Sequence, residues 1–516
     1  MIYKTIFFIV FFIYKGKAND CIPRKFNYDS IVCVCNSTYC DSLSNVEEPK
    51  KGSYYAYTSN KEGLRLKFST GTFVGKFNYS LIPDENQMSS LSTTVTINRD
   101  KKYQEICGFG GAFTDATGIN IKQLSELTQD NLLRSYFDDN GSKYNLGRIP
   151  IGGSDFSTRA YTLDDTKDDN ELKHFKLTTE DLEYKMPFIK KAKVLSPKLK
   201  MVGAVWSPPI WMKSNNKYSG PSVLLKEHYQ TYANYYIKFL QAYKSHGIDV
   251  WAVSTGNEPN DAWWPGANIS SMGWIPFQLG DWIANNLGPT LARSEHNETA
   301  ILVLDDQRFY LIEFLDYILA NKKAYDYIHG IAVHWYTDDF VSPSLLDITR
   351  DKYPSKYLLL TEACVGSKPN DHPKVKLGSW ERGEEYILNI IQNLRHGVTG
   401  WMDWNLALNK NGGPNYINNF VDSPIIVNPE TDEFFKQPMY YGIKHFSRFV
   451  ERDSVRIESM ETNDIKTIAF ETPSKIIVVI LYNMSSESKN ITIIDSKSGN
   501  IKMTVSSYSI HTILYK

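Results

Sequence analysis

Short segments in which apolar and polar residues alternate stand near both ends of the chain. They are Leu64–Ser69 and Thr93–Asn98 on one side, and Lys475–Tyr482, Ile491–Ile494 and Tyr508–Tyr515 on the other. A period of two predicts antiparallel strands. Neither end supplies enough strands for a stable sheet packing of its own. We therefore predict that the two ends fold together and that the middle of the chain is inserted between them.

The middle of the chain has a different rhythm, in which short apolar runs are followed by helix-like stretches such as Glu227–His246 and Trp380–Leu394. The runs are Gln104–Gly108, Leu146–Ile151, Lys200–Trp206, Val250–Thr255, Ile301–Leu304, Ile328–His334, Tyr357–Leu360 and Val398–Asp403. Repeated β-then-α units of this number predict a (β/α)8 barrel. A doubly wound parallel sheet is the alternative, because strands buried on both faces fit either arrangement.

The N-terminal residues 1–18 have the features of a secretory signal peptide. Lys4 provides the positive start, Ile6–Tyr14 is an apolar run too short to span a membrane, and Ala18 fits the small-residue cleavage rule. Seven Asn-X-Ser/Thr sequons follow, at Asn36, Asn78, Asn140, Asn268, Asn297, Asn483 and Asn490. Together these features predict a glycoprotein of the secretory pathway.

Four cysteines, Cys21, Cys33, Cys35 and Cys40, cluster directly after the signal peptide. In an oxidising compartment this cluster predicts two disulfides. A zinc site is the alternative, although the cluster lacks the paired second half that such sites have.

The overall charge excludes one class of partner. The chain has 57 Lys and Arg against 58 Asp and Glu, a net charge of −1, so no basic excess supports nucleic-acid binding. Protonation of all ten His would raise the net charge to +9, so an acidic compartment would make the surface cationic. Anionic lipids are the partners that such a surface would attract.

Two glutamates stand where a barrel enzyme carries its chemistry. Glu258 follows the fourth apolar run in Thr255–Pro259 (TGNEP), and Glu362 follows the seventh in Leu360–Cys364 (LTEAC). Barrel active sites lie at the carboxyl ends of the strands, and strands four and seven face each other. Hydrolysis of a glycosidic bond needs such a pair, one carboxyl to protonate the leaving oxygen and one to attack or to activate water.

A metal site is the other interpretation of polar residues at strand ends. Asp305, Asp306 and His334 could act as ligands, but no HExxH-type spacing supports them. We expect neither a metal nor an organic cofactor.

Several longer stretches resemble the glucosylceramidases (acid β-glucosidases) of glycoside hydrolase family 30. They are Cys33–Cys40 (CVCNSTYC), Gly108–Asp115 (GFGGAFTD), Gly330–Tyr336 (GIAVHWY), Glu362–Ser367 (EACVGS), Asp403–Asn409 (DWNLALN) and Asn419–Pro424 (NFVDSP). The resemblance covers nearly the whole chain after the signal peptide. It implies a (β/α)8 TIM barrel, a β-sandwich formed by both chain ends, and a small antiparallel sheet with the disulfides Cys21–Cys33 and Cys35–Cys40.

The resulting domain assignment has four parts. Residues 1–18 are the signal peptide, 19–49 with 405–437 the small β domain, 50–102 with 454–516 the β-sandwich, and 103–404 with 438–453 the catalytic barrel.

The resemblance also assigns roles to residues. Glu258 is the expected acid/base and Glu362 the expected nucleophile of a retaining enzyme. The expected glucose-binding residues are Asp155, Trp206, Asn257, Trp404 and Asn419, and the expected supporting residues are Arg148, His334 and Tyr336. Asp and Asn side chains can bond sugar hydroxyls, whereas the Trp rings can pack on the sugar face.

The implied reaction is hydrolysis of glucosylceramide to glucose and ceramide through a covalent glucosyl-enzyme. The implied setting is the lysosomal lumen, peripheral to a membrane, or secretion, with a glycosphingolipid substrate and a saposin-type activator protein as partners. The loop Asp261–Ile275 departs from the family and carries Trp263, Trp264 and the Asn268 sequon. The aglycone is therefore open, with a soluble β-glucoside, a β-xyloside or a sterol glucoside as alternative substrates. A non-catalytic carbohydrate-binding protein is the alternative from another class.

Overall fold

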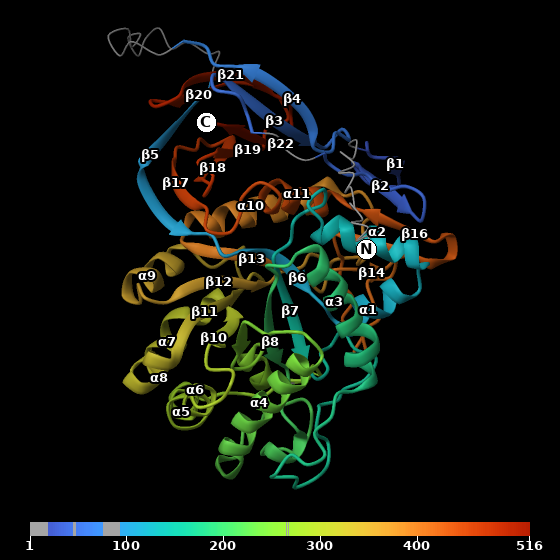
Figure 1. The fold of residues 1–516 in the computed structure, drawn as a ribbon, viewed down its shortest axis with the longest axis vertical. Helices are drawn as coiled ribbons and strands as arrows, with labels where there is room; N and C mark the ends of the chain where they lie inside the picture. The colour runs from blue at the N-terminus through green and yellow to red at the C-terminus, as the bar shows by residue number, and fades with distance from the viewer. Residues whose placement is uncertain (1–18, 45–47, 76–92, 265, 267) are drawn as a thin grey trace, which may run out of the picture.

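The computed structural model describes residues 19–44, 48–75, 93–264, 266 and 268–516. A barrel forms the centre of the molecule, a large sheet packs against two of the helices that surround it, and a small sheet lies beside the large one (Figure 1). The predicted signal peptide and the Asn78 sequon lie outside the described residues. Within the described part of the chain, no helix combines the length and the apolar character that crossing a membrane requires.

Eight parallel strands close the barrel in the order β6 to β13. They are β6 (Gly108–Ala112), β7 (Leu146–Ile151), β8 (Lys200–Val205), β9 (Ala252–Ser254), β10 (Ala300–Gln307), β11 (Ile328–His334), β12 (Tyr357–Glu362) and β13 (Val398–Asn405). The predicted barrel is confirmed, and the doubly wound alternative is wrong because β13 pairs with β6 and leaves no open edge.

Helices connect these strands and surround the barrel (Figure 1). They are α1 (Asp115–Lys122), α2 (Glu126–Phe137), α3 (Met186–Leu195), α4 (Tyr229–Ser245), α5 (Pro276–Trp282), α6 (Gly288–Ala292), α7 (Leu311–Leu319), α8 (Lys322–Tyr327), α9 (Ser344–Lys352), α10 (Trp380–Arg395) and α11 (Pro438–Ser447). Their apolar faces pack on the strands and form most of the core.

The first barrel strand is not where the apolar pattern placed it. The strand was predicted at Gln104–Gly108, but β6 is Gly108–Ala112, with the sequence GFGGA. A Cβ atom on Gly110 would lie 1.9 Å from the backbone oxygen of Leu146 on the neighbouring strand. The close approach of the strands therefore requires glycine here, and a glycine-rich strand carries little apolar signal.

The large sheet joins both ends of the chain, as predicted. Its nine strands run in the order β21 (Gly499–Val505), β20 (Lys489–Asp495), β5 (Thr93–Glu105), β17 (Val455–Ser459), β18 (Ile465–Glu471), β19 (Ile477–Asn483), β22 (Ser509–Tyr515), β3 (Ser53–Asn60) and β4 (Lys67–Thr72). Strand β19 shows how the pattern works, because Val479 and Leu481 enter a core within this domain, whereas Ile480 and Tyr482 pack against the core of the barrel. Both faces are thus buried at the centre of the sheet.

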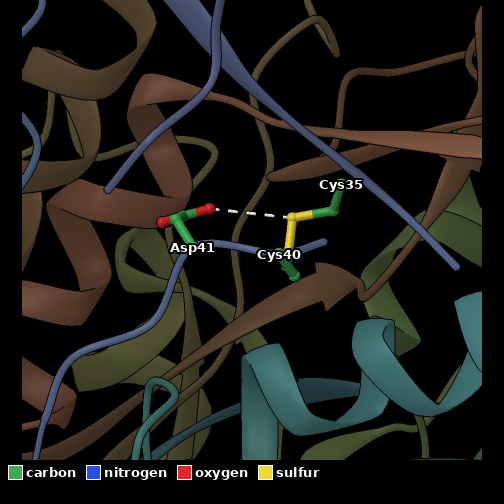
Figure 2. Close-up of side chains that lie close together, drawn as sticks. All are labelled: Cys35, Cys40 and Asp41. Carbon is green, nitrogen blue, oxygen red and sulfur yellow. Dashed lines mark hydrogen bonds between the residues drawn. A yellow bond between two sulfur atoms is a disulfide. The ribbon is translucent and has the colours of Figure 1, made fainter. Parts of the chain in front are cut away.

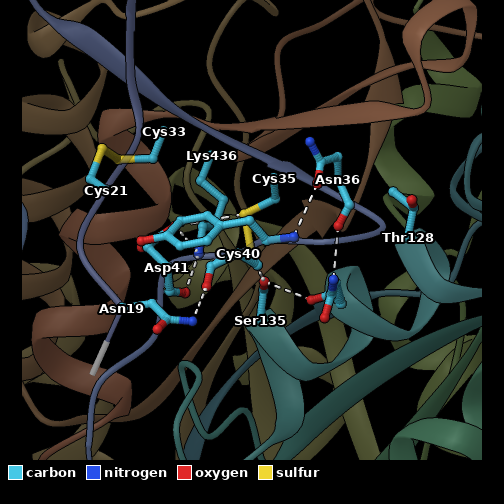
Figure 3. Close-up of a disulfide and its surroundings, with 12 residues drawn as sticks. Asn19, Cys21, Cys33, Cys35, Asn36, Cys40, Asp41, Thr128, Ser135 and Lys436 are labelled. Atoms are coloured by element: carbon cyan, nitrogen blue, oxygen red, sulfur yellow. Dashed lines mark hydrogen bonds and ion pairs between the residues drawn. A yellow bond between two sulfur atoms is a disulfide. The ribbon is translucent and has the colours of Figure 1, made fainter. Parts of the chain in front are cut away.

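The small sheet has five strands, in the order β1 (Pro23–Lys25), β2 (Ile31–Asn36), β16 (Glu433–Lys436), β15 (Ile425–Asn428) and β14 (Leu408–Asn409). Figure 3 shows its two disulfides, Cys21–Cys33 and Cys35–Cys40, which are the pairs that the resemblance implied. All four sulfur atoms are paired in these two disulfides, so the cluster offers no thiolates for the alternative zinc site.

A buried ion pair lies within the domain of this small sheet, and a hydrogen bond from helix α11 joins it to the barrel. Asp41 follows the second disulfide, and one of its carboxylate oxygens lies 3.6 Å from Cys35 Sγ (Figure 2). A disulfide sulfur has no hydrogen to donate, so the carboxylate finds its partners elsewhere. Lys436 Nζ lies 2.5 Å from Asp41 Oδ1, and the Tyr441 hydroxyl donates to Asp41 Oδ2 at 2.7 Å. Burial alone would raise the pKa of Asp41, but the charges of Lys436 and Lys444 lower it below its usual value.

We predict that Lys436→Met lowers stability by about 3–5 kcal/mol, because it leaves a buried carboxylate without its cation. The double variant Asp41→Asn/Lys436→Met should recover more than half of that loss, since no buried charge then remains. Urea unfolding of the oxidised protein, followed by tryptophan fluorescence, measures both. Equal losses in the single and the double variant would contradict this account.

Candidate active site

A cavity of about 350 Å³ opens at the carboxyl ends of the barrel strands. Among its lining residues are Asp155, Trp206, Asn257, Glu258, Tyr336, Glu362, Trp404 and Asn419. The structure therefore brings together both predicted catalytic residues and all five predicted glucose-binding residues. The other two supporting residues, Arg148 and His334, are fully buried and contact the two glutamates through hydrogen bonds.

Glu258 is held in a left-handed backbone conformation directly after β9. Its φ is +41°, and its N–H donates to the carbonyl of Asp305 at 2.9 Å. Asp305 itself has a φ of +48° at a bulge near the end of β10. Strained backbone of this kind persists where the surrounding contacts fix it, and it aims side chains that a regular strand would turn away. Here it directs Glu258 into the cavity.

One oxygen of the Glu258 carboxyl is already engaged by the protein. Oε1 accepts from His334 Nδ1 at 2.7 Å and from Gln307 Nε2 at 2.6 Å. Burial first, and then the neighbouring charge of Asp261, raise the pKa of Glu258 well above its usual value. Glu258 therefore keeps a proton over a wide pH range, as a general acid must.

Glu362 is the last residue of β12, and each oxygen of its carboxylate accepts a hydrogen bond. Arg148 donates to Oε2, and the Tyr336 hydroxyl donates to Oε1 at 2.8 Å. A charge-assisted bond on one oxygen and a hydroxyl on the other fix the orientation of the carboxylate.

Arg148, on β7, connects the parts of the site. Besides Glu362, its guanidinium donates to Asn257 Oδ1 at 2.6 Å and to Asp305 Oδ2 at 2.8 Å. Burial would raise the pKa of Asp305, but the charge of Arg148 and the bonds from His334 hold it below its usual range. Burial would lower the pKa of His334, whereas Glu362, Asp305 and Glu258 raise it to about 10. His334 is thus a second buried cation.

The two glutamates and His334 lie close enough to chelate an ion. One carboxylate oxygen of Glu258, one of Glu362 and a ring nitrogen of His334 all lie within 4.8 Å of one another. Both ring nitrogens of His334 already face carboxylates, since Nε2 lies 3.0 Å from Asp305 Oδ1. A cationic imidazole has no lone pair to offer, so this donor set does not fit a metal ion.

The opposite wall of the cavity offers a flat aromatic surface and a hydroxyl-binding corner. The rings of Trp206 and Trp404 stack with their centroids 5.1 Å apart. Asp155 Oδ2 accepts from the side-chain amides of Asn415 and Asn419, each at 3.2 Å. Burial, and then the charge of Glu362, raise the pKa of Asp155 to about 7.

Sequence reasoning missed three residues of the site. Gln307 and Asn415 contact Glu258 and Asp155 directly, and Asp261 lines the cavity. Only Gln307 carried a signal, because it directly follows Asp305 and Asp306 at a strand end. Asn415 lies in an irregular segment and Asp261 in a short helical turn, and no motif marks either of them.

Comparison with protein families matches the chain over almost all of the barrel and the sheet. Residues 106–450 match the glycosyl hydrolase family 30 TIM-barrel domain, and residues 453–513 match the family 30 beta sandwich domain. The chain belongs to glycoside hydrolase family 30. It is therefore a glycoside hydrolase, and both the family resemblance and the predicted enzyme class are confirmed.

Individual relatives extend over nearly the full length. The lysosomal acid glucosylceramidase of Mus musculus is 42% identical over 508 residues, which is 97% of this chain and 96% of the mouse protein. The putative glucosylceramidase 3 of Caenorhabditis elegans is 39% identical over 514 residues, 96% of this chain and 95% of the worm protein. The crystal structure of SrfJ from Salmonella typhimurium is similar with a TM-score of 0.81 and 27% identity, over 90% of this chain and 99% of SrfJ.

We predict that the folded protein is more stable at pH 5.5 than at pH 7.5. Burial raises the pKa of both Asp155 and Asp306 to about 7. Between about pH 4 and pH 7 the folded state keeps protons that the unfolded state has lost, so the free energy of unfolding falls as the pH rises. Burial lowers the pKa of His445 and, to about 4, that of His511, and these groups act in the opposite sense below about pH 6.5.

Thermal unfolding midpoints between pH 5 and pH 8 measure this effect. The double variant Asp155→Asn/Asp306→Asn should show a smaller difference between pH 5.5 and pH 7.5 than the wild type. A variant whose midpoints keep the full wild-type difference would show that these carboxyls are not the cause.

Proposed function

We propose that the protein is a retaining β-glucosidase that hydrolyses glucosylceramide to glucose and ceramide. The observation that carries this proposal is the pair Glu258 and Glu362, of which one carboxylate oxygen each lies within 4.8 Å of the other at the carboxyl ends of β9 and β12, three strands apart in the barrel. Retaining glycosidases have carboxyl groups about 5–5.5 Å apart, whereas inverting ones need room for a water between them, about 6.5–9.5 Å.

In the first step Glu362 attacks the anomeric carbon of glucose, and Glu258 donates its proton to the departing glycosidic oxygen. Arg148 and Tyr336 orient the attacking carboxylate. The negative charge left on Glu258 is met by the two donors on its Oε1, His334 and Gln307.

In the second step Glu258 takes a proton from water, which attacks the covalent glucosyl-enzyme and releases glucose. Asn257 supports both steps in this proposal. Arg148 fixes its Oδ1, so its side-chain amide group is left to bond the 2-hydroxyl of the sugar. That contact strengthens in the transition state of many glycosidases.

Asp155, Asn419 and the paired rings of Trp206 and Trp404 fit the remaining contacts with glucose. The carboxyl and the amide can bond hydroxyls on the sugar edge, and a ring can cover its apolar face. Each of these residues lines the same cavity as the two glutamates. The site therefore accommodates the non-reducing end of a substrate and leaves the aglycone toward the rim.

The rim supports a lipid aglycone. The mouse relative is a glucosylceramidase by name and the worm relative a putative one. Exposed aromatic side chains stand on the segments that follow β9, β10 and β11. These side chains are Trp264, 61% exposed, Phe309, 63% exposed, and Phe340, 75% exposed. Exposed apolar groups around the mouth of a site are typical of proteins that contact a membrane.

We place this activity in an acidic, lysosome-like lumen, at a membrane surface that contains anionic lipids, with a saposin-type activator as a partner. The raised pKa of Glu258 and the name of the mouse relative support the acidic setting. The expected charge of +9 is too high, because His445 and His511 are buried with lowered pKa values and do not become surface cations.

A second candidate keeps the mechanism and changes the aglycone. The loop Asp261–Ile275 departs from the family, and the exposed Asn268 sequon lies on it beside the cavity. A glycan at Asn268 would be hydrophilic at the same rim, which favours a soluble β-glucoside over a lipid glucoside.

We predict that the wild type releases glucose from glucosylceramide in anionic-lipid vesicles at about pH 5, and that Glu362→Gln does not, because the amide cannot form the glucosyl-enzyme. Loss of at least about 10⁴-fold is expected for a nucleophile. Glucose release with a folding control by circular dichroism measures this. Near-normal turnover in Glu362→Gln would refute the mechanism. Activity on a soluble aryl β-glucoside alone would favour the second candidate.

We also predict that Phe309→Ser/Phe340→Ser reduces turnover on vesicles about tenfold or more while sparing a soluble aryl β-glucoside, since burying each Phe contributes about 1.5–3 kcal/mol. Val194→Ser is the matched control, because Val194 is 79% exposed on α3, away from the mouth. Vesicle sedimentation reports binding separately. Equal effects on both substrates would show that the rim acts on the site rather than on the lipid.

A further inference from the structure

A third carboxyl group stands beside the acid/base residue. Asp261 belongs to the short helical turn η6 (Pro259–Trp263) that begins directly after Glu258. Its N–H donates to the carbonyl of Glu258 at 3.0 Å, which closes the turn, and both side chains line the cavity. The Asp261 carboxyl lies within hydrogen-bonding reach of the Glu258 carboxyl.

Only one oxygen of the Glu258 carboxyl is available for a contact with Asp261. Oε1 is taken by His334 and Gln307. Oε2 accepts from neither of these donors, and we assign it as the oxygen that shares a proton with Asp261. Two carboxyl groups in contact cannot both be ionised without a large cost, so they hold a proton between them.

The turn itself is anchored independently of this pair. The backbone N–H and the side-chain amide of Asn260 both donate to Asp306 Oδ2, at 3.1 and 2.9 Å. Asp306 is buried and is not among the residues that line the cavity. The position of Asp261 is thus fixed by the backbone and by a neighbour, and within the described residues Glu258 is the side chain that bonds its carboxyl.

We propose that Asp261 is a positioning residue that shares the transferable proton of Glu258, so that a pair of carboxyl groups acts as the general acid. This inference rests on the proposed function. Asp261 lies in the loop that departs from the family pattern, so the pair belongs to this chain rather than to the resemblance.

The proton balance is simple. Before the reaction the pair holds one proton on Glu258 Oε2, bonded to the Asp261 carboxylate. During cleavage that proton moves to the glycosidic oxygen, the C–O bond breaks, and a new bond forms from Glu362 to the anomeric carbon. The second negative charge now on the pair lies opposite the donors His334 and Gln307.

Other charged groups also face the acid. Asp261 lies on the turn that follows Glu258, and His334, on β11, bonds both Glu258 and Asp305 of β10. Glu362, on β12, is the further carboxylate near Glu258, and Arg148 of β7 compensates its charge. Burial comes first and the charge of Asp261 second among the causes that raise the pKa of Glu258. Removing the Asp261 carboxyl should therefore change when the acid loses its proton.

The test is the pH dependence of kcat/KM in Asp261→Asn. For an alkyl β-glucoside, whose leaving oxygen needs a proton, the alkaline limb should move to lower pH by about one unit or more. For 2,4-dinitrophenyl β-glucoside, whose leaving group departs without a proton, the limb should stay where it is in the wild type. Asp261→Glu keeps a carboxyl and should restore most of the wild-type profile.

Asp306→Asn is the matched control, because it removes a buried carboxyl next to the same turn but outside the cavity. Its alkaline limb should coincide with that of the wild type. A shift of equal size in Asp306→Asn would assign the effect to general electrostatics of the loop. Coincident profiles of Asp261→Asn and the wild type, or equal shifts for the two substrates, would overturn the proposal.

A measurement without substrate separates this inference from the proposed function. If the wild type cleaves no β-glucoside, the proposed function fails, but the pair can still be tested by stability. Raising the pH should destabilise the wild type more than Asp261→Asn, because only the wild type must ionise two adjacent carboxyls. Identical pH dependence of their thermal midpoints would overturn the pair.

Discussion

The arrangement of the candidate active site depends on the contacts of the Arg148 guanidinium. It is buried in the barrel, where an uncompensated charge would cost several kcal/mol, and it has three polar partners: Glu362, Asp305 and Asn257. It also lies 4.9 Å from the ring centre of Trp206 and 5.5 Å from that of Trp404. One cation thus contacts Glu362, the proposed nucleophile, Asn257, whose amide is proposed to bind the 2-hydroxyl, and the two stacked Trp rings. The geometry of the site follows from the need to compensate that buried charge.

The barrel is stable enough to tolerate this concentration of buried charge. Its strands are held by backbone hydrogen bonds around a closed ring, so the side chains at their carboxyl ends are not needed for strand pairing. In strand β6 the side chain itself is dispensed with, because only glycine at position 110 lets the backbone approach Leu146 of the neighbouring strand so closely. Stability lies in the packed body and in contacts such as Asp41 with Lys436, while the mouth carries the strained backbone at Glu258 and Asp305.

The fold could be predicted from the sequence because its signals are local. Alternating and continuous apolar runs mark most strands, and Glu258 and Glu362 stand at the ends of two of them. Strand β6 was misplaced because glycine carries no apolar signal. The residues of the sugar wall, such as Asn419, came only from the resemblance. Gln307, Asn415 and Asp261 act through partners far away in the chain or across a turn, and no local pattern encodes such a contact.

The charge balance at the mouth of the cavity explains why several of its carboxyl groups have raised pKa values. Two buried cations, Arg148 and His334, face Asp305 and Glu362, and these four charges cancel. Every further carboxyl in the cavity is then an excess negative charge. Burial accordingly raises the pKa of Asp155, of Glu258 and of Asp261. As the pH rises these carboxyl groups ionise and repel one another, whereas in acid they are neutral and Glu258 can donate its proton. The ten histidines of the sequence suggested an adaptation of the surface to acid. In the proposed function, the response to acid lies instead in the carboxyl groups of the cavity, whose protons balance the charge and are donated in the reaction.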